Sequence, residues 1–110
     1  MNNNYIPQQQ DIIWIDFDPQ SGKEIMKRRP ALVLSNDNYN LQTGLVVISP
    51  ITHTHKNDLT YIPVTGTKPD GYVNALQIHS FDYRTRNATL IEMAPSSVLL
   101  RVMQIFEQIF

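Results

Sequence analysis

Two adjacent arginines, Arg28 and Arg29, run directly into Pro30 and an apolar stretch that ends at Ser35. Proline cannot donate a hydrogen bond to the interior of a sheet, so Pro30 predicts the start or the edge of a strand. Arg29 then stands where a loop becomes fixed sheet, a place that suits a catalytic or ligand-binding arginine. The alternative is a pair of solvated charges beside an edge strand.

Four further side chains could carry chemistry, but their spacing is not decisive. His53 and His55 would share a face on a strand and could bind a metal or act as an acid–base pair. Only Asp58 stands nearby as an oxygen ligand, which favours a solvated loop over a metal site. Glu24 precedes Arg28 by four positions, a spacing that favours a salt bridge in the loop over a general base. His79 alternates within a predicted strand, which indicates a structural or groove-lining role.

Several classes of enzyme lack their motifs in this sequence. There is no glycine-rich dinucleotide or nucleoside triphosphate loop, no G-x-S-x-G and no H-E-x-x-H. The absence of cysteine removes disulfides, thiol catalysis and thiolate metal sites. The motifs therefore argue against nucleotide-fuelled enzymes, serine hydrolases and zinc proteases.

Length and charge indicate one neutral domain with a local positive region. The 110 residues predict a single domain over residues 1–110, and the net charge of −1 argues against a generally basic nucleic-acid binder. Four of the nine basic residues nevertheless lie between Lys23 and Arg29, so one positive groove is compatible with overall neutrality. The first residues resemble no secretory signal, and no apolar run is long enough to cross a bilayer, which predicts a cytoplasmic protein without membrane contact.

The elements that must position these residues are mostly strands. Alternating or continuous apolar residues predict strands at 11–18, 30–35, 45–49, 59–64, 72–81 and 88–93. A helical turn is expected at 36–44, with Asn36 or Asp37 as its cap and Gly44 as its stop. A terminal helix follows Pro95, with Ser96 as its cap. The pattern predicts a mainly β fold, a small antiparallel sheet or β-barrel with short helices.

In chain order, a set of short segments resembles the MazF/PemK-type toxins, which are sequence-specific endoribonucleases of toxin–antitoxin systems. The segments are 11–19, 29–35, Tyr39-Asn40 with Thr43-Gly44, 50–52, Asp70-Gly71, Gln77-Ile78 and the 84–86 turn. None of these segments is specific alone, but the ordered set covers nearly the whole chain.

The resemblance implies an SH3-like barrel of the CcdB/MazF/PemK toxin type with a C-terminal helix. It further implies a homodimer that holds single-stranded RNA (mRNA) in a groove at its interface. Cleavage would need no metal or other cofactor: the 2′-hydroxyl attacks its own phosphate and leaves a 2′,3′-cyclic phosphate and a 5′-hydroxyl. A cognate antitoxin with an acidic, disordered tail would occupy the path of the RNA.

The resemblance also implies roles for individual residues. Arg29 would carry the main catalytic role, Thr52 would hydrogen-bond the phosphate, and Glu24 would support the loop or assist proton transfer. Contacts to RNA would come from Phe17, Arg28, Asn36, Gln77 and Ser80. Arginine is a poor general base because its pKa exceeds about 12, so stabilisation of phosphorane charge is its expected contribution.

One departure and two alternatives accompany this reading. Gln10 stands where the family usually has glycine before the first strand, which questions the geometry of that turn. The same fold also occurs in CcdB-like toxins, which inhibit DNA gyrase through the terminal helix. A non-catalytic SH3-like interaction module is the other alternative.

Overall fold

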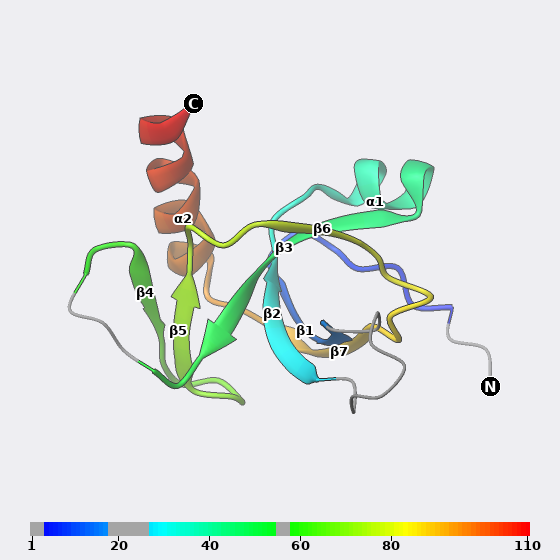
Figure 1. Ribbon diagram of the computed structural model, residues 1–110, viewed down its shortest axis with the longest axis horizontal. Coiled ribbons are helices and arrows are strands. Elements are labelled where there is room, and N and C mark those ends of the chain that lie inside the picture. Colours follow the sequence, from blue (N-terminus) through cyan, green and yellow to red (C-terminus); the bar gives the residue numbers. More distant parts are fainter. Residues whose placement is uncertain (1–3, 18–26, 55–57) are drawn as a thin grey trace.

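The computed structural model describes residues 4–17, 27–54 and 58–110, and these residues form a mainly β structure (Figure 1). The strands are β1 (Asp11–Asp16), β2 (Arg28–Val33), β3 (Leu45–Thr52), β4 (Tyr61–Val64), β5 (Gly71–Asn74), β6 (His79–Asp82) and β7 (Thr89–Met93). The helices are α1 (Asp37–Thr43) and α2 (Ser96–Ile109). The prediction of a mainly β fold with a short helix and a C-terminal helix is confirmed.

All strand pairs in the described sheet are antiparallel, and β3 connects its two halves. The strands follow the order β4-β5-β3-β2-β1-β7, and β6 pairs with β3 outside that path. β3 pairs with β2 and β6 over its first part and with β5 at Ile51 and Thr52 (Figure 1). The long strand β3 therefore connects the β4–β5 ribbon to the half of the sheet that contains β1, β2, β6 and β7.

Apolar residues on both faces of β1 and β2 build two cores. Ile12 and Leu32 belong to the core that packs against α2, whereas Ile13, Ile15 and Ala31 belong to the core on the opposite face. Each fully buried isoleucine contributes about 1.5–3 kcal/mol to folding. The predicted common face of Ile13, Ile15 and Phe17 is confirmed, because Phe17 packs against the second core.

The prediction for the first helix is confirmed at both ends. The Asn36 side chain accepts a hydrogen bond from the Tyr39 amide at 2.8 Å, as an N-cap should. Gly44 ends the helix with φ of 72°, a left-handed conformation that favours glycine. Gln10 adopts φ of 84° before β1 without being glycine, and its side chain donates to the Ala94 carbonyl at 2.6 Å. The turn before β1 therefore forms even though Gln10 stands where the family usually has glycine.

α2 differs from the prediction at its start. Pro95 is the N-cap and Ser96 is the first helical residue, and no side-chain hydrogen bond caps the helix, so the prediction of Ser96 as the cap is wrong. Val98 and Val102 are buried against the sheet, while Leu100, Ile109 and Phe110 are exposed. Neither helix of the described chain has the length and apolar character that a membrane span requires.

The structure corrects several strand boundaries, including those of β2, which begins at Arg28 instead of Pro30 and ends at Val33 instead of Ser35. β3 does not close at Pro50 but continues to Thr52, because Pro50 lies where the strand changes its partner from β2 to β5. Pro50 is the last β3 residue that pairs with β2, so its missing N–H does not interrupt the middle of the β2–β3 ladder. The predicted strand 72–81 is two strands, β5 and β6, separated by a turn that contains Gln77.

Candidate functional site

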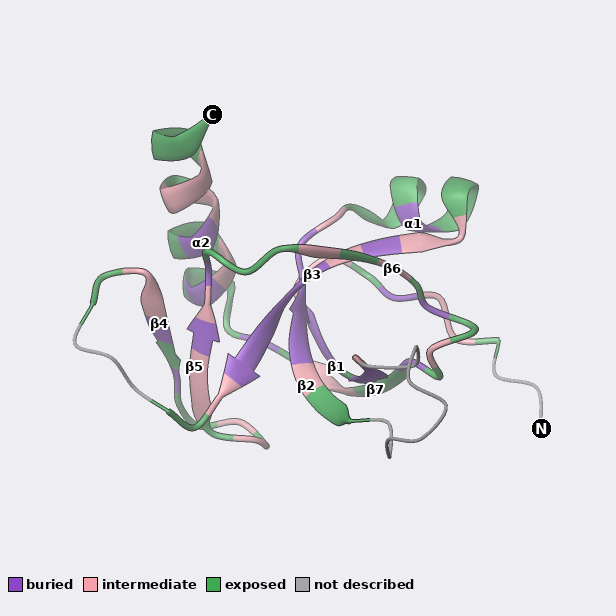
Figure 2. Cartoon of the chain, in the orientation of Figure 1, coloured by how far each residue is buried: buried purple, intermediate pink, exposed green. Residues whose placement is uncertain are grey.

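Arg28 and Arg29 lie at the exposed start of β2 (Figure 2). Alternation along the strand directs their side chains to opposite faces of the sheet. Arg28 pairs with Asp16 across the β1–β2 ladder and shares its face with Pro30. Arg29 pairs with Ile15 and shares its face with Ala31. Adjacent positions in the sequence thus place the same side chain in two different environments.

Arg28 is held by a polar network on its face. Its guanidinium donates to Asp16 at 3.1 Å and to the Thr89 hydroxyl at 2.9 Å. Asn87 donates to the other carboxylate oxygen of Asp16 at 2.8 Å. The Asp16 side chain is 8% exposed and that of Arg28 is 36% exposed, so the pair joins a buried anion to a half-exposed cation. This geometry ties β1, β2 and β7 together.

Arg29 contacts an aromatic ring instead of a carboxylate. Its guanidinium carbon lies 5.7 Å from the centre of the Phe17 ring, within the range of a cation–π interaction. Among residues 4–17, 27–54 and 58–110, no carboxylate forms a salt bridge with Arg29. Arg29 is exposed, so its charge is available to an anion from outside.

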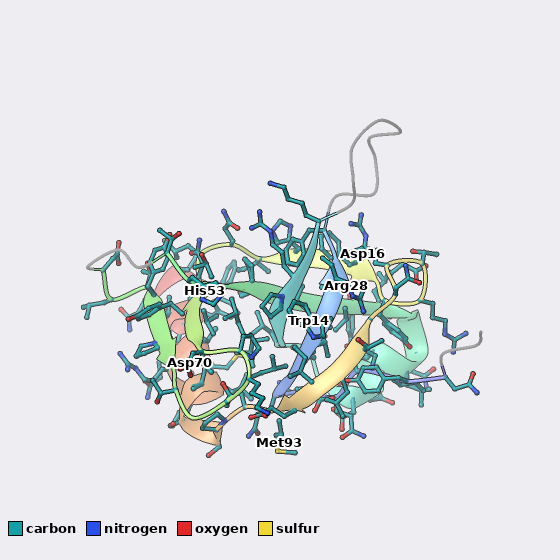
Figure 3. All side chains as sticks on the ribbon, turned by 90° about the horizontal axis from the view of Figure 1, so that it is seen from below. Trp14, Asp16, Arg28, His53, Asp70 and Met93 are labelled. Carbon is teal, nitrogen blue, oxygen red and sulfur yellow. The ribbon has the colours of Figure 1, made fainter. Side chains whose placement is uncertain are left out.

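A cleft of about 500 Å³ joins the start of β2 to the end of β3. Its lining includes Arg29 and Thr52, together with Trp14, Arg28 and His53. Thr52 lies two residues beyond Pro50, the last β3 residue that pairs with β2, and it lines the cleft together with Arg29. In Figure 3, Trp14 and Arg28 lie together on one side and His53 lies across from them. The cleft therefore combines cationic, hydroxyl and aromatic groups.

Gly71 is the residue that lets β5 approach the end of β3. A Cβ atom added at Gly71 would lie 2.7 Å from the Thr52 carbonyl oxygen, closer than side chains approach backbone atoms. The Thr52 hydroxyl in turn accepts a hydrogen bond from the Thr54 amide at 3.1 Å. Gly71 and Thr54 thus position Thr52 at the edge of the cleft.

Three aromatic rings continue the surface beyond Arg29. His79 lies 5.4 Å from Phe17 and 5.1 Å from Phe81, measured between ring centres. The Arg86 guanidinium carbon lies 3.8 Å from the centre of the Phe81 ring, and its Nη1 donates to the Phe17 carbonyl at 3.0 Å. Burial, followed by the positive charges of Arg86 and Arg29, lowers the pKa of His79 below its ordinary value of 6.5. The imidazole is therefore neutral at pH 7.

The other predicted RNA-binding residues are spread over several places. Asn36 uses its side-chain oxygen to cap α1 and lines a separate cavity with Val47. Ser80 is exposed and pairs with Val47 across the β3–β6 ladder, opposite in face to His79. Gln77 is exposed in the turn before β6. Glu24 and His55 lie outside the described residues.

The local sequence signals did not identify Trp14, Phe81 and Arg86 as parts of this surface. Alternation in β1 directs Trp14 away from Ile13 and Ile15, and at 38% exposed it is a large apolar side chain in the cleft. Alternation in β6 likewise places Phe81 on the same face as His79. The prediction of one long strand over 72–81 did not separate β6 as a short strand of its own. Among the described residues, no group of three histidine or acidic side chains could hold a metal ion.

The whole chain is similar to a defined family of proteins. The family described as PemK-like, MazF-like toxins of type II toxin–antitoxin systems matches residues 8–110. The endoribonuclease toxin MazF of Escherichia coli K12 is 39% identical over 89 residues, which cover 81% of this chain and 80% of that protein. The endoribonuclease toxin ChpB of the same organism is 35% identical over 108 residues, covering 88% of this chain and 91% of that protein.

Solved structures show the same fold. A chain in a crystal structure of MazE–MazF (Form-II) from Deinococcus radiodurans matches with a TM-score of 0.89 and 34% identity, over 96% of both chains. A crystal structure of MazF (Form-I) from the same organism matches with a TM-score of 0.82 and 36% identity, over 92% of this chain and 93% of that chain. The predicted fold of the toxin type is thereby confirmed.

Proposed function

The chain belongs to the PemK-like, MazF-like toxins of type II toxin–antitoxin systems, and from this premise we propose how it acts on RNA. It is an endoribonuclease toxin. The proposed substrate is single-stranded mRNA, cut at a defined sequence without a metal ion or other cofactor. Cleavage of mRNA would stop translation and growth.

The observation that supports this chemistry best is that the exposed Arg29 and Thr52 line one cleft. A phosphate seated there would receive the planar fork of the guanidinium and the hydroxyl of Thr52. Within the described residues Arg29 forms no salt bridge, so none of the described carboxylates competes with a phosphate for its guanidinium.

The proposed reaction is an internal transesterification. The ribose 2′-oxygen loses its proton and bonds to the adjacent phosphorus, and the bond from phosphorus to the 5′-oxygen breaks. The departing oxygen gains a proton, so the products are a 2′,3′-cyclic phosphate and a 5′-hydroxyl. Arg29 and Thr52 would stabilise the additional negative charge on the phosphorane oxygens. Glu24 is proposed to support the loop or to assist proton transfer.

Contacts along the RNA follow the surfaces around the cleft. Phe17 is proposed to stack on a base, which costs no charge and tolerates many sequences. Arg28 would act as a secondary phosphate neighbour, since its guanidinium lines the cleft but is held by Asp16. Asn36, Gln77 and Ser80 are proposed to bind base edges farther from the cleft.

Two protein partners belong to the proposal. The first is a second copy of the chain, in a homodimer with RNA along its interface, for which the exposed apolar side chains of α2 provide a contact surface. The second is a cognate antitoxin, proposed because a chain of similar fold comes from a MazE–MazF structure. Its acidic, disordered tail would meet Arg29 and the aromatic rings beside it.

A direct test incubates the purified protein with a long single-stranded RNA in EDTA and sequences the new 5′ ends. We expect discrete cuts whose 5′-hydroxyls accept phosphate from a polynucleotide kinase without prior dephosphorylation. Arg29→Ala and Thr52→Ala should remove these cuts, while the charge-matched control Arg101→Ala on α2 should retain them. Uncut RNA together with gyrase trapped on DNA would favour the CcdB-like alternative.

A further inference from the structure

The rings around His79 form a platform whose chemistry differs from that of the cleft beside it. Phe17 meets His79 edge to face at 78°, while His79 and Phe81 are tilted by 30°. These side chains come from the end of β1 and from β6, and Arg86 covers one end of the group. The platform therefore offers a partly exposed aromatic surface, in which the His79 and Phe81 rings are closest to parallel, and such a surface suits stacking by an unpaired base.

His79 is the only ring of the three that also carries hydrogen-bonding nitrogens. Within the part of the chain that the structure describes, neither nitrogen forms a hydrogen bond. A neutral imidazole has one N–H donor and one acceptor nitrogen, so it can hydrogen-bond a base edge. Phe17 and Phe81 can stack on a base but cannot recognise its polar edge.

The charges around the imidazole come from two elements. Arg29 on β2 and Arg86 in the turn after β6 both face His79 and disfavour its protonation. Arg29 and His79 both contact the Phe17 ring: the guanidinium carbon of Arg29 lies 5.7 Å and the ring centre of His79 5.4 Å from the centre of that ring. A base on His79 would therefore belong to a nucleotide at or next to the phosphate on Arg29.

We propose that His79 is a specificity-determining residue that selects the base next to the cleaved bond, through a hydrogen bond made on the Phe17–Phe81 platform. This inference rests on the proposed function, because it names the residue that reads the substrate of that site. His79 takes no part in bond breaking. Its nitrogens select the base, and its ring contributes to stacking.

Two variants separate the nitrogens from the ring. His79→Phe keeps an aromatic ring and removes both nitrogens, whereas His79→Gln keeps a donor and an acceptor and removes the ring. The control is Gln42→Leu, which removes the hydrogen-bonding groups of an exposed side chain on α1 that does not line the cleft. The readouts are the map of cut sites on a long RNA, kcat/KM for one oligonucleotide, and the thermal unfolding of each variant.

We expect His79→Phe to cut RNA with total activity within about tenfold of the unsubstituted protein while losing about tenfold or more of its preference at one base position. His79→Gln should keep the preference and raise KM by roughly 5- to 150-fold, which is the range for a lost stacking contact. Gln42→Leu should leave the cut map unchanged.

The outcomes distinguish this inference from the function on which it rests. If the unsubstituted protein cuts RNA and both folded His79 variants keep its cut map, His79 is structural and the inference is overturned. If His79→Phe unfolds, His79→Gln still decides the question. Lower stability with an unchanged KM in His79→Gln would assign His79 a structural role and overturn the inference. If the unsubstituted protein leaves RNA intact, the proposed function is contradicted, and the inference that rests on it is overturned as well.

Discussion

The two faces of β2 hold the same side chain in opposite ways. On one face, Arg28 donates to a buried aspartate and a threonine, and these bonds connect three strands. On the other face, Arg29 lies over Phe17 and forms no salt bridge within the described chain. A guanidinium already bound by a carboxylate stabilises the fold, whereas one beside a ring remains available to a phosphate.

The comparison also explains how a neutral chain can bind RNA. Net charge counts Arg28 and Arg29 equally, although Asp16 neutralises the first and no described acid neutralises the second. Local pairing therefore decides which positive charges a substrate meets. Aromatic rings beside Arg29 add binding that does not depend on net charge.

The strongest perturbation of the Arg28 face is removal of its anion. Asp16→Ala should lower the free energy of unfolding by about 2–3 kcal/mol, because Arg28 and Asn87 both lose their acceptor inside the fold. Urea unfolding at one fixed protein concentration measures the loss. Asp70→Ala, an exposed acid on another loop, is the control and should change stability by less than about 0.5 kcal/mol. An unchanged stability in Asp16→Ala would remove the structural role assigned to the network.

A smaller perturbation removes the second acceptor of Arg28. Thr89→Val deletes the hydroxyl that Arg28 contacts at 2.9 Å in an exposed position, so we expect a loss of about 0.5 kcal/mol. RNA cleavage should be unaffected, as it should be in the control Thr65→Val. If Thr89→Val were fully stable but cleaved RNA more slowly, Thr89 would contact the substrate instead.

Local patterns predicted some features of the fold and missed others for physical reasons. Asn36 and Gly44 were predictable as helix ends because capping and the left-handed conformation depend on nearby residues. The end of β3 was not, because Pro50 is tolerated only through a change of strand partner that no local pattern contains. Gln77 was predicted to lie in a strand because apolar residues alternate with polar ones on both sides of it. That local pattern does not show the turn between β5 and β6.

The candidate site shows the same division. The position of Arg29 at the start of a strand followed from Pro30, but its separation from Arg28 required the pairing of Asp16 with β2. Trp14 and Phe81 became visible as parts of the surface only when strands distant in sequence were brought together. Glu24 remains a prediction, because it lies outside the described residues.

The central claim is that the two arginines have separate roles, and matched glutamine variants test it most directly. For each variant, kcat/KM on one RNA and the free energy of unfolding are measured on the same preparation. Arg29→Gln should lower kcat/KM by about 10²–10³-fold and leave stability within about 0.5 kcal/mol. Arg28→Gln should lower stability by about 1 kcal/mol and keep kcat/KM within about tenfold. Equal losses of activity in two fully stable variants would contradict the account.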